Sequence, residues 1–294
     1  MATSAPRAVF VGLCTLDVIQ SVDRVPGANE KVAAHQLLLA AGGPATNAAV
    51  AFAHLGGSPT LVTTLPRHAL SDVIREDLSG CGVTLVAAVD DNTDPPVTAS
   101  IMVTRTTGER AVVSPSSGAI GLDSPARTIP PLDGVGAILV DGYHPTTAIA
   151  AAKAARASGI PVLMDAGSLK PHTAQVAREV DLVVASADLA TPEGSRDPED
   201  VFAWLGGLGI ERAVITRGAE EVLWRTPGAS GAVAVPPVTV VDTLGAGDFF
   251  HGALTWRVAS LGAADARLAE DIAWAAQAVA PSLGSFGTRA WLRG

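Results

Sequence analysis

The chain is poor in cysteine and aromatic residues, and it has no long hydrophobic run. Its 294 residues include two cysteines, one tyrosine and six phenylalanines. Cys14 and Cys81 are far apart and belong to no C-x-x-C pair, which disfavours a disulfide framework and a metal site and favours a reducing cytoplasm. The first seven residues form a short polar segment, and no span of about 20 apolar residues follows. We therefore expect neither a signal peptide nor contact with a membrane.

Positive charge is also scarce. The 20 Lys and Arg residues are outnumbered by 29 Asp and Glu residues, which gives a formal net charge of -9. Without a long basic run, we expect no binding of nucleic acid through its phosphates. Small anions are not excluded, because backbone amides at a helix N-terminus can hold a phosphate even in an acidic protein.

What the chain does have is a regular alternation of apolar strands and helices. Short apolar runs predict strands at residues 8–12, 60–65, 137–140, 161–164, 182–185 and 213–216. Helical patterns occupy residues 45–55, 70–79, 146–158, 198–208, 246–260 and 263–280. This alternation predicts an α/β fold with a mainly parallel central sheet that helices cover on both faces.

Two half-polar segments do not fit the buried central sheet. Residues 15–40 contain a Pro26-Gly27 turn, and residues 97–114 contain a hairpin turn at Thr107-Gly108. We expect them to form a small second sheet, made of about 14–40 and 97–115, within a single domain spanning 1–294. A sheet that projects in this way could close over a binding site as a lid.

A glycine-rich run lies near the C-terminus, between a strand expected at 238–241 and a helix. The run from Asp242 to Asp248 reads DTLGAGD. At the carboxyl end of a strand, its glycines would allow a ligand to come close, and the unpaired amides of the helix would favour an anion. Asp248 in the first helical turn is then placed to take a proton from an attacking hydroxyl.

Spacing alone leaves other interpretations of this run open. A dinucleotide-binding G-x-G-x-x-G would need Gly or Ala where the chain has Phe250, and only helix follows. No P-loop sequence G-x-x-x-x-G-K-[ST] occurs. An ordinary glycine-rich turn, with Asp248 as a helix-start residue, remains compatible with the same spacing.

Two segments together resemble the signatures of a known family. VVDTLGAGDFFHGA, residues 240–253, resembles the C-terminal signature of the ribokinase-like (phosphofructokinase-B) carbohydrate kinases, and GGPATNAA, residues 42–49, resembles their N-terminal signature. Both occur in the family's order and at its separation, and the resemblance covers essentially the whole chain. It implies a ribokinase-like three-layer α/β/α fold with a small β-sheet lid. It also implies an ATP-dependent phosphotransferase with an alcohol group as acceptor.

The resemblance assigns roles to residues of both signatures. Asp248 is implied as the catalytic base, with an anion hole formed by the backbone amides of Gly245, Ala246 and Gly247. The implied sugar-binding residues are Asp17, Gly42, Gly43 and Asn47. A carboxylate accepts two hydroxyl hydrogen bonds at once, which suits Asp17 for this role. By residue type, Asp17 is also compatible with a solvated acid at a strand end, and Asn47 with an exposed helix residue.

Contacts to ATP are implied by less specific matches. The residues concerned are Thr216, Gly218, Lys170 and Gly284. Thr216 and Gly218 also fit an ordinary exit from a strand. Lys170 and Arg110 are placed to reach the phosphates, although long basic side chains are commonly just solvated.

The resemblance also implies metal ions, but it does not identify the residues of this chain that would bind them. Mg²⁺ is expected because phosphoryl transfer from ATP requires charge neutralisation. Many relatives carry an N-x-x-E motif that organises this ion, whereas this chain has Ser186 and Leu189 at the corresponding ends of the motif. Its protein contacts are therefore unknown, and water-mediated binding is expected. A K⁺ site near Asp242 stays open.

Within the family, the sequence looks most like the ketohexokinase and sulfofructose kinase branch, on VGLCTLDVI at residues 11–19 and on the glycine-rich run. This predicts transfer of the γ-phosphoryl group of ATP to a hydroxyl of a small sugar, in the first place a fructose-like ketose. A nucleoside or sulfosugar kinase is the alternative, although aromatic residues are few and no arginine follows the strand ending at Val140. A sugar-binding regulatory protein without catalysis also stays open. Relatives often dimerise through their lid sheets, which implies a homodimer.

Overall fold

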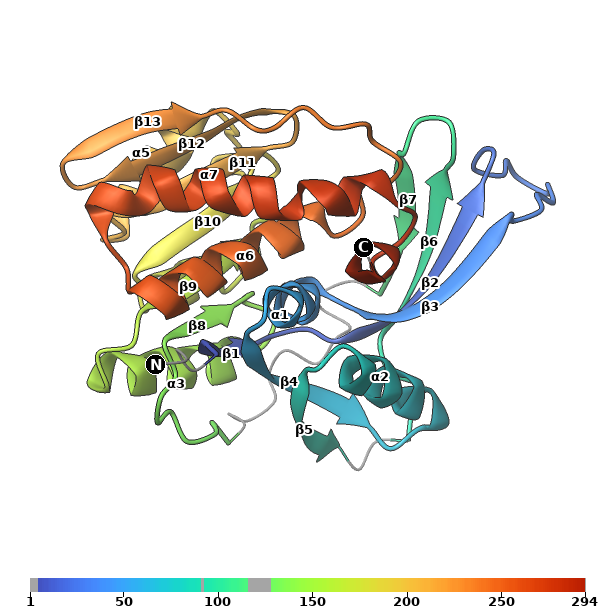
Figure 1. Ribbon diagram of the computed structural model, residues 1–294, viewed down its shortest axis with the longest axis horizontal. Coiled ribbons are helices and arrows are strands. Elements are labelled where there is room, and N and C mark those ends of the chain that lie inside the picture. The colour runs from blue at the N-terminus through green and yellow to red at the C-terminus, as the bar shows by residue number, and fades with distance from the viewer. Residues whose placement is uncertain (1–4, 91–92, 116–127, 294) are drawn as a thin grey trace.

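A nine-stranded sheet runs through the part of the chain that the computed structural model describes, residues 5–90, 93–115 and 128–293 (Figure 1). Its strand order is β13-β12-β11-β10-β9-β8-β1-β4-β5, and neighbours from β11 to β5 are parallel. The strands are β1 Arg7–Val11, β4 Ser58–Pro66, β5 Thr84–Asp90, β8 Ala137–Val140, β9 Val162–Ala166, β10 Leu182–Ser186, β11 Ala213–Arg217, β12 Glu220–Thr226 and β13 Ala229–Val233. The predicted mainly parallel sheet is confirmed.

Helices cover both faces of this sheet, because successive residues of the buried strands point to opposite sides. In β1, Ala8 and Phe10 pack into one apolar cluster, whereas Val9 and Val11 pack into the other. The first cluster is shared with α1 Pro44–His54, α2 Ala69–Gly80, α6 Ala246–Leu261 and α7 Leu268–Val279. The second is shared with α3 Pro145–Ala157, α4 Thr173–Ala177 and α5 Pro198–Gly207. By length and hydropathy, the helices of the described ranges fall short of what a bilayer span needs.

A separate four-stranded sheet projects from one side of the molecule (Figure 1). Its strands are β2 Thr15–Val22, β3 Gln36–Gly42, β6 Thr98–Thr104 and β7 Arg110–Val113, in the order β3-β2-β6-β7. Only the central β2 and β6 pairing is parallel. Ile19, Ile101 and Val103 form a small buried cluster on one face of this sheet, together with Leu244 of the glycine-rich run. The small sheet therefore arises from the two half-polar segments and packs onto that run.

The strand expected at 238–241 is wrong. Those residues pair with no strand in the described structure, and the side chains of Val238, Val240 and Val241 are exposed. The amide of Val241 instead donates to the carbonyl of Leu283 at 2.7 Å, in the 3-10 turn Ala280–Gly284. Pro236 and Pro237 precede the segment and cannot donate ladder hydrogen bonds, which explains why an apolar run stays outside the sheet.

The structure also contains elements that were not expected, and one helix begins later than expected. The β12–β13 hairpin was not expected, because its strands mix polar and apolar residues. Strand β5 was not expected either, although it contains the apolar run Leu85–Val89. The last long helix begins at Leu268 rather than at 263, directly after a 3-10 turn at Asp265–Arg267. A further 3-10 segment lies at Ala290–Arg293. None of these changes moves the carboxyl edge of the parallel strands, where a ligand site is expected.

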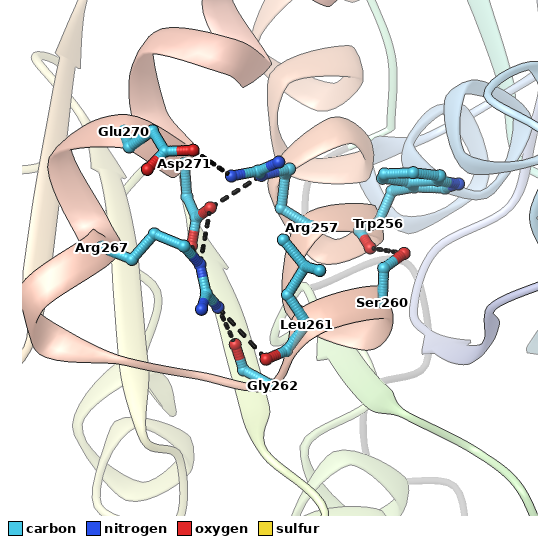
Figure 2. A network of polar contacts seen from close by, with 8 residues as sticks. All are labelled: Trp256, Arg257, Ser260, Leu261, Gly262, Arg267, Glu270 and Asp271. Atoms are coloured by element: carbon cyan, nitrogen blue, oxygen red, sulfur yellow. Dashed lines mark hydrogen bonds and ion pairs between the residues drawn. The ribbon is translucent and has the colours of Figure 1, made fainter.

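A network of polar contacts holds α7 against α6 (Figure 2). The buried carboxylate of Asp271 accepts hydrogen bonds from Nε of Arg257 at 2.7 Å and from Nε of Arg267 at 3.1 Å. Arg267 also donates to the carbonyls of Leu261 and Gly262 at the end of α6. The turn between the helices is thus closed around one buried acid.

Replacing Asp271 by alanine should lower the free energy of unfolding by about 3–5 kcal/mol, because two arginines would lose a buried partner. Glu270→Ala is the matched control, since the Glu270 side chain is 72% exposed although it also pairs with Arg257. That change should cost less than about 1 kcal/mol. Urea denaturation of both variants measures the difference, and equal losses would contradict the assignment.

Candidate active site

The site begins where the strand order reverses, between β1 and β8. Asp141, directly after β8, is buried, and its carboxylate accepts from the amide of Leu13 at 2.8 Å and from the amide of Tyr143 at 2.9 Å. It also accepts from the amide of Ala45 at the start of α1, at 3.2 Å. A side chain on Gly12 would collide with this carboxylate, because a built Cβ lies 2.1 Å from it. Burial raises the pKa of Asp141 to about 6. One acid therefore ties together three segments around the crevice in which α/β proteins bind ligands.

Asp17 lies against the glycine pair that precedes α1. A Cβ built on Gly42 would fall 2.0 Å from Oδ2 of Asp17, so the carboxylate occupies the space that a side chain would fill. Gly43 has φ +100°, and a Cβ there would lie 2.4 Å from the carbonyl oxygen of Leu13. Thr15 donates to Oδ1 of Asp17 at 2.6 Å, and burial raises the pKa of Asp17. Both glycines are thus required by close approach, and Asp17 is a buried rather than a solvated acid.

Gly42→Ala should lower kcat/KM for the acceptor substrate that the resemblance implies by about 10²-fold, because it displaces the Asp17 carboxylate from its position. Gly206→Ala in α5 is the control, since a Cβ built there meets nothing within 4 Å. That variant should keep the kinetics of the wild type. Steady-state assays of both proteins decide the matter, and equal kinetics for all three proteins would refute the argument.

The two resembling segments meet in a direct hydrogen bond. Nδ2 of Asn47 donates to Oδ2 of Asp248 at 2.9 Å, across a sequence separation of 201 residues. Asn47 is buried on α1, and its Oδ1 has no hydrogen-bond partner. An unpaired buried acceptor beside a carboxylate suits a hydroxyl that would donate to it.

Asp248 lies in the first turn of α6, which begins after Gly245 in the left-handed conformation, with φ +76°. The amide of Ala246 donates to the carbonyl of Thr243 at 3.3 Å, and a Cβ built on Gly247 would meet nothing within 4 Å. Burial, followed by the negative charge of Asp165, raises the pKa of Asp248 to about 7, against the lowering effects of Asn47 and His251. The amide of Ala246 is thus occupied, whereas the helix N-terminus is open at Gly247, beside a carboxylate with the pKa of a general base.

The glycine-rich run is held in place by Asp242. Its buried carboxylate accepts from the amide of Leu244 and from the amide of Gly287, each at 2.8 Å. The lid reaches the same loop, because Arg110 donates to Oγ1 of Thr243 at 2.9 Å. Arg110 is therefore beside the run, whereas both oxygens of Asp242 already serve the backbone.

The residues expected around a nucleotide lie at the ends of neighbouring elements. Thr216 is in β11, and its Oγ1 donates to the carbonyl of Ala185 at 3.3 Å. Gly218, with φ +63°, makes the turn into β12. Gly284 follows Leu283, whose carbonyl accepts from the amide of Val241. Lys170 follows β9, and its Nζ lies 4.5 Å from the centre of the Tyr143 ring, over its face.

Four residues of the site were not predicted from the sequence: Asp141, Tyr143, Asp165 and His251. Burial and the carboxylates of Asp141, Asp165 and Asp248 raise the pKa of Tyr143 to about 12, which places this phenol among the acids. A polar residue near the carboxyl end of an apolar strand, as Asp165 is in β9, was the available signal. Ser186 and Leu189 stand at the Asn and Glu positions of the N-x-x-E motif. Ser186 donates to the carbonyl of Gly167 at 2.8 Å, and Leu189 is buried among apolar residues. The carboxylate of the motif is therefore missing at this place.

The family of pfkB carbohydrate kinases matches residues 5–290 of the chain. The chain belongs to this family. The kinase is therefore a phosphotransferase that uses ATP and has an alcohol group as acceptor. The resemblance of its two signatures is confirmed.

Ribokinases are among its relatives. One from Arabidopsis thaliana is 26% identical over 266 residues, which are 85% of this chain and 69% of that protein. One from Mus musculus is 24% identical over 267 residues, 87% of this chain and 82% of the relative. The structure of a putative ribokinase from Agrobacterium tumefaciens has a TM-score of 0.84 at 24% identity, covering 98% of this chain and 94% of that one. That of Arabidopsis thaliana ribokinase complexed with ribose and ATP has a TM-score of 0.77 at 24% identity and covers 98% of each chain. The ribokinase-like fold is thereby confirmed.

Proposed function

We propose that the kinase transfers the γ-phosphoryl group of ATP to a hydroxyl of a small sugar, with Asp248 as the base. The observation that carries this proposal is the hydrogen bond between Asn47 and Asp248 beside the open N-terminus of α6. Asp248 takes the proton of the hydroxyl, the hydroxyl oxygen attacks the γ-phosphorus, and ADP leaves. The amides of Gly245 and Gly247, joined by that of Ala246 once it leaves the carbonyl of Thr243, stabilise the negative charge of the transferring group.

Sugar hydroxyls have two sets of partners in this arrangement. The carboxylate of Asp17 accepts hydrogen bonds from one part of the sugar, and the unpaired Oδ1 of Asn47 accepts from another. Gly42 and Gly43 allow the sugar to approach the backbone closely. Thr216, Gly218, Lys170 and Gly284 remain the residues proposed to contact ATP, with Arg110 reaching the phosphates from the lid.

The first candidate substrate is a fructose-like ketose, and ribose is the second because the relatives are ribokinases. A nucleoside is a third candidate, since aminoimidazole riboside kinase from Salmonella enterica shares the fold with a TM-score of 0.74, at 21% identity over 97% of this chain and 96% of that chain. The test is a panel of ketoses, pentoses, sulfosugars and nucleosides with ATP. If the purified kinase phosphorylates none of them and forms no ADP, the proposal fails, and a sugar-binding regulatory protein becomes the better account.

Mg²⁺ is expected to enter with ATP, where it would neutralise phosphate charge. The described residues contain no group of three His, Cys, Asp or Glu side chains that could hold a metal ion. We therefore assign it no protein ligand and expect its contacts to run through phosphate and water. Replacing K⁺ by Na⁺ in the same assay tests whether the reaction depends on K⁺. We expect the reaction in the cytoplasm, where ATP is available.

We infer that the small sheet is a lid and also the surface through which two copies meet. Its outer strands are β3 and β7, and both are edge strands within the described sheet. Leu37 on β3 is 64% exposed and Val113 on β7 is 67% exposed. Apolar side chains on unpaired edges favour association with a second copy.

Leu37→Lys combined with Val113→Lys should convert a dimer into a monomer, because two charges would enter an apolar interface. Sedimentation equilibrium measures the mass of both proteins. Leu261→Lys is the control, since Leu261 is 50% exposed at the end of α6, away from the lid. A wild type that is monomeric at high concentration would refute the lid interface.

A further inference from the structure

His251 is buried on α6, one turn after Asp248. Its Nδ1 lies 2.6 Å from the carbonyl oxygen of Gly247, and its Nε2 lies 3.1 Å from the carbonyl oxygen of Val184 in β10. Both ring nitrogens therefore face backbone carbonyls. A carbonyl oxygen can only accept a hydrogen bond.

Only a ring with two N–H groups satisfies both of these contacts. A neutral imidazole carries one N–H, so one of its nitrogens would turn a lone pair toward a carbonyl oxygen. The imidazolium carries two N–H groups and satisfies both contacts. A buried positive charge needs a negative partner, and Oδ2 of Asp165 lies 3.4 Å from Nδ1 of His251 with no hydrogen-bond partner of its own. Asp165 thus offers a buried counter-ion to a protonated His251, behind the carboxylate of Asp248.

The ion pair acts on the site in two ways. The Gly247 carbonyl and the Asp248 amide share one peptide plane and point in opposite directions, so a bond that fixes the carbonyl also fixes the amide. The positive charge, one helical turn from Asp248, favours the ionised form of that carboxylate. The other titratable groups that act on Asp248 or feel its charge are Asp165 in β9, Asp17 in β2 and Tyr143 after β8.

We propose that His251 is a protonated positioning residue, paired with Asp165, which orients the first turn of α6 and favours the ionised form of Asp248 for proton transfer. The kinetic part of this proposal rests on Asp248 being the base. The protonation of His251 does not, because it follows from the contacts of the ring alone.

Nitrogen-15 NMR of histidine-labelled wild type tests the charge directly. A histidine in water loses one ring proton as the pH rises past about 6.5. Of the six histidines, at least one should still carry protons on both ring nitrogens at pH 8, and His251→Gln should remove that signal. If every ring of the folded wild type carries a single proton at pH 8, the proposal is overturned, whatever the enzyme phosphorylates.

The pH dependence of kcat/KM tests the effect on Asp248. His251→Gln should shift the acid limb of the kcat/KM profile to higher pH by about one unit. At pH values below this limb the variant should be about tenfold less active than the wild type, and at high pH the two should be equal. A His251→Gln variant that loses the same factor at every pH would show a merely structural role and refute the proposal, with the kinase function intact. A wild type without activity would instead refute the proposed function.

Discussion

Replacing Asp248 by asparagine should lower kcat about 10²–10⁴-fold, with little change in the KM values for sugar and ATP. Asparagine has nearly the same shape as aspartate and can still accept the hydrogen bond from Asn47. It cannot take up the proton of the attacking hydroxyl. The loss should therefore fall on the chemical step, which steady-state kinetics separates from binding.

The pH dependence gives a second signature of Asp248. Burial and Asp165 raise the pKa of this carboxyl to about 7, so wild-type activity should rise with pH through that value as the base becomes ionised. Because the folded pKa lies above the unfolded one, the contribution of Asp248 to stability is full at low pH and is lost as the pH rises through about 7. Asp248→Asn should consequently melt at the same or a higher temperature than the wild type at pH 8. Lost activity with a lower Tm would indicate misfolding, and retained activity would exclude Asp248 as the base.

Asp17→Ala should lower kcat/KM for the sugar about 10²–10⁴-fold and leave the KM for ATP nearly unchanged. A carboxylate can accept hydrogen bonds from two hydroxyls, and each bond to a charged group contributes about 1.5–3 kcal/mol. Asp17 is buried against Gly42, so water cannot freely replace the lost carboxylate. Kinetics at varied sugar and fixed ATP measure the effect.

Asp23 supplies the control for Asp17, since it follows the same strand, β2, at its other end. Its side chain is 61% exposed and pairs with His35 and Arg105. Asp23→Ala should keep the kcat/KM of the wild type, because exposed ion pairs contribute little. If Asp23→Ala and Asp17→Ala lose the same activity, the effect comes from disturbing the lid strand and not from a sugar contact.

Local patterns were sufficient for much of the fold. Continuous apolar runs such as Ala137–Val140 identify buried parallel strands, because a strand covered on both faces needs no polar side. The same reasoning failed at 238–241, where three exposed valines follow Pro236 and Pro237 and pair with no strand. An apolar run becomes a strand only if a neighbour lies within pairing distance, and that is a property of the assembled chain.

The sequence by itself determined the strand–helix alternation, the two half-polar lid segments, and the glycines and acids of the two signatures, since each depends on residue types a few positions apart. Only the tertiary structure decided which of them meet. The contact between Asn47 and Asp248 spans 201 residues, and its 2.9 Å length follows from the packing of α1 against α6. The same holds for His251, whose type and helix position suggested no role. The carbonyl of Val184 and the carboxylate of Asp165 reach it from separate strands, so its charge depends on the folded sheet and not on its neighbours in the chain.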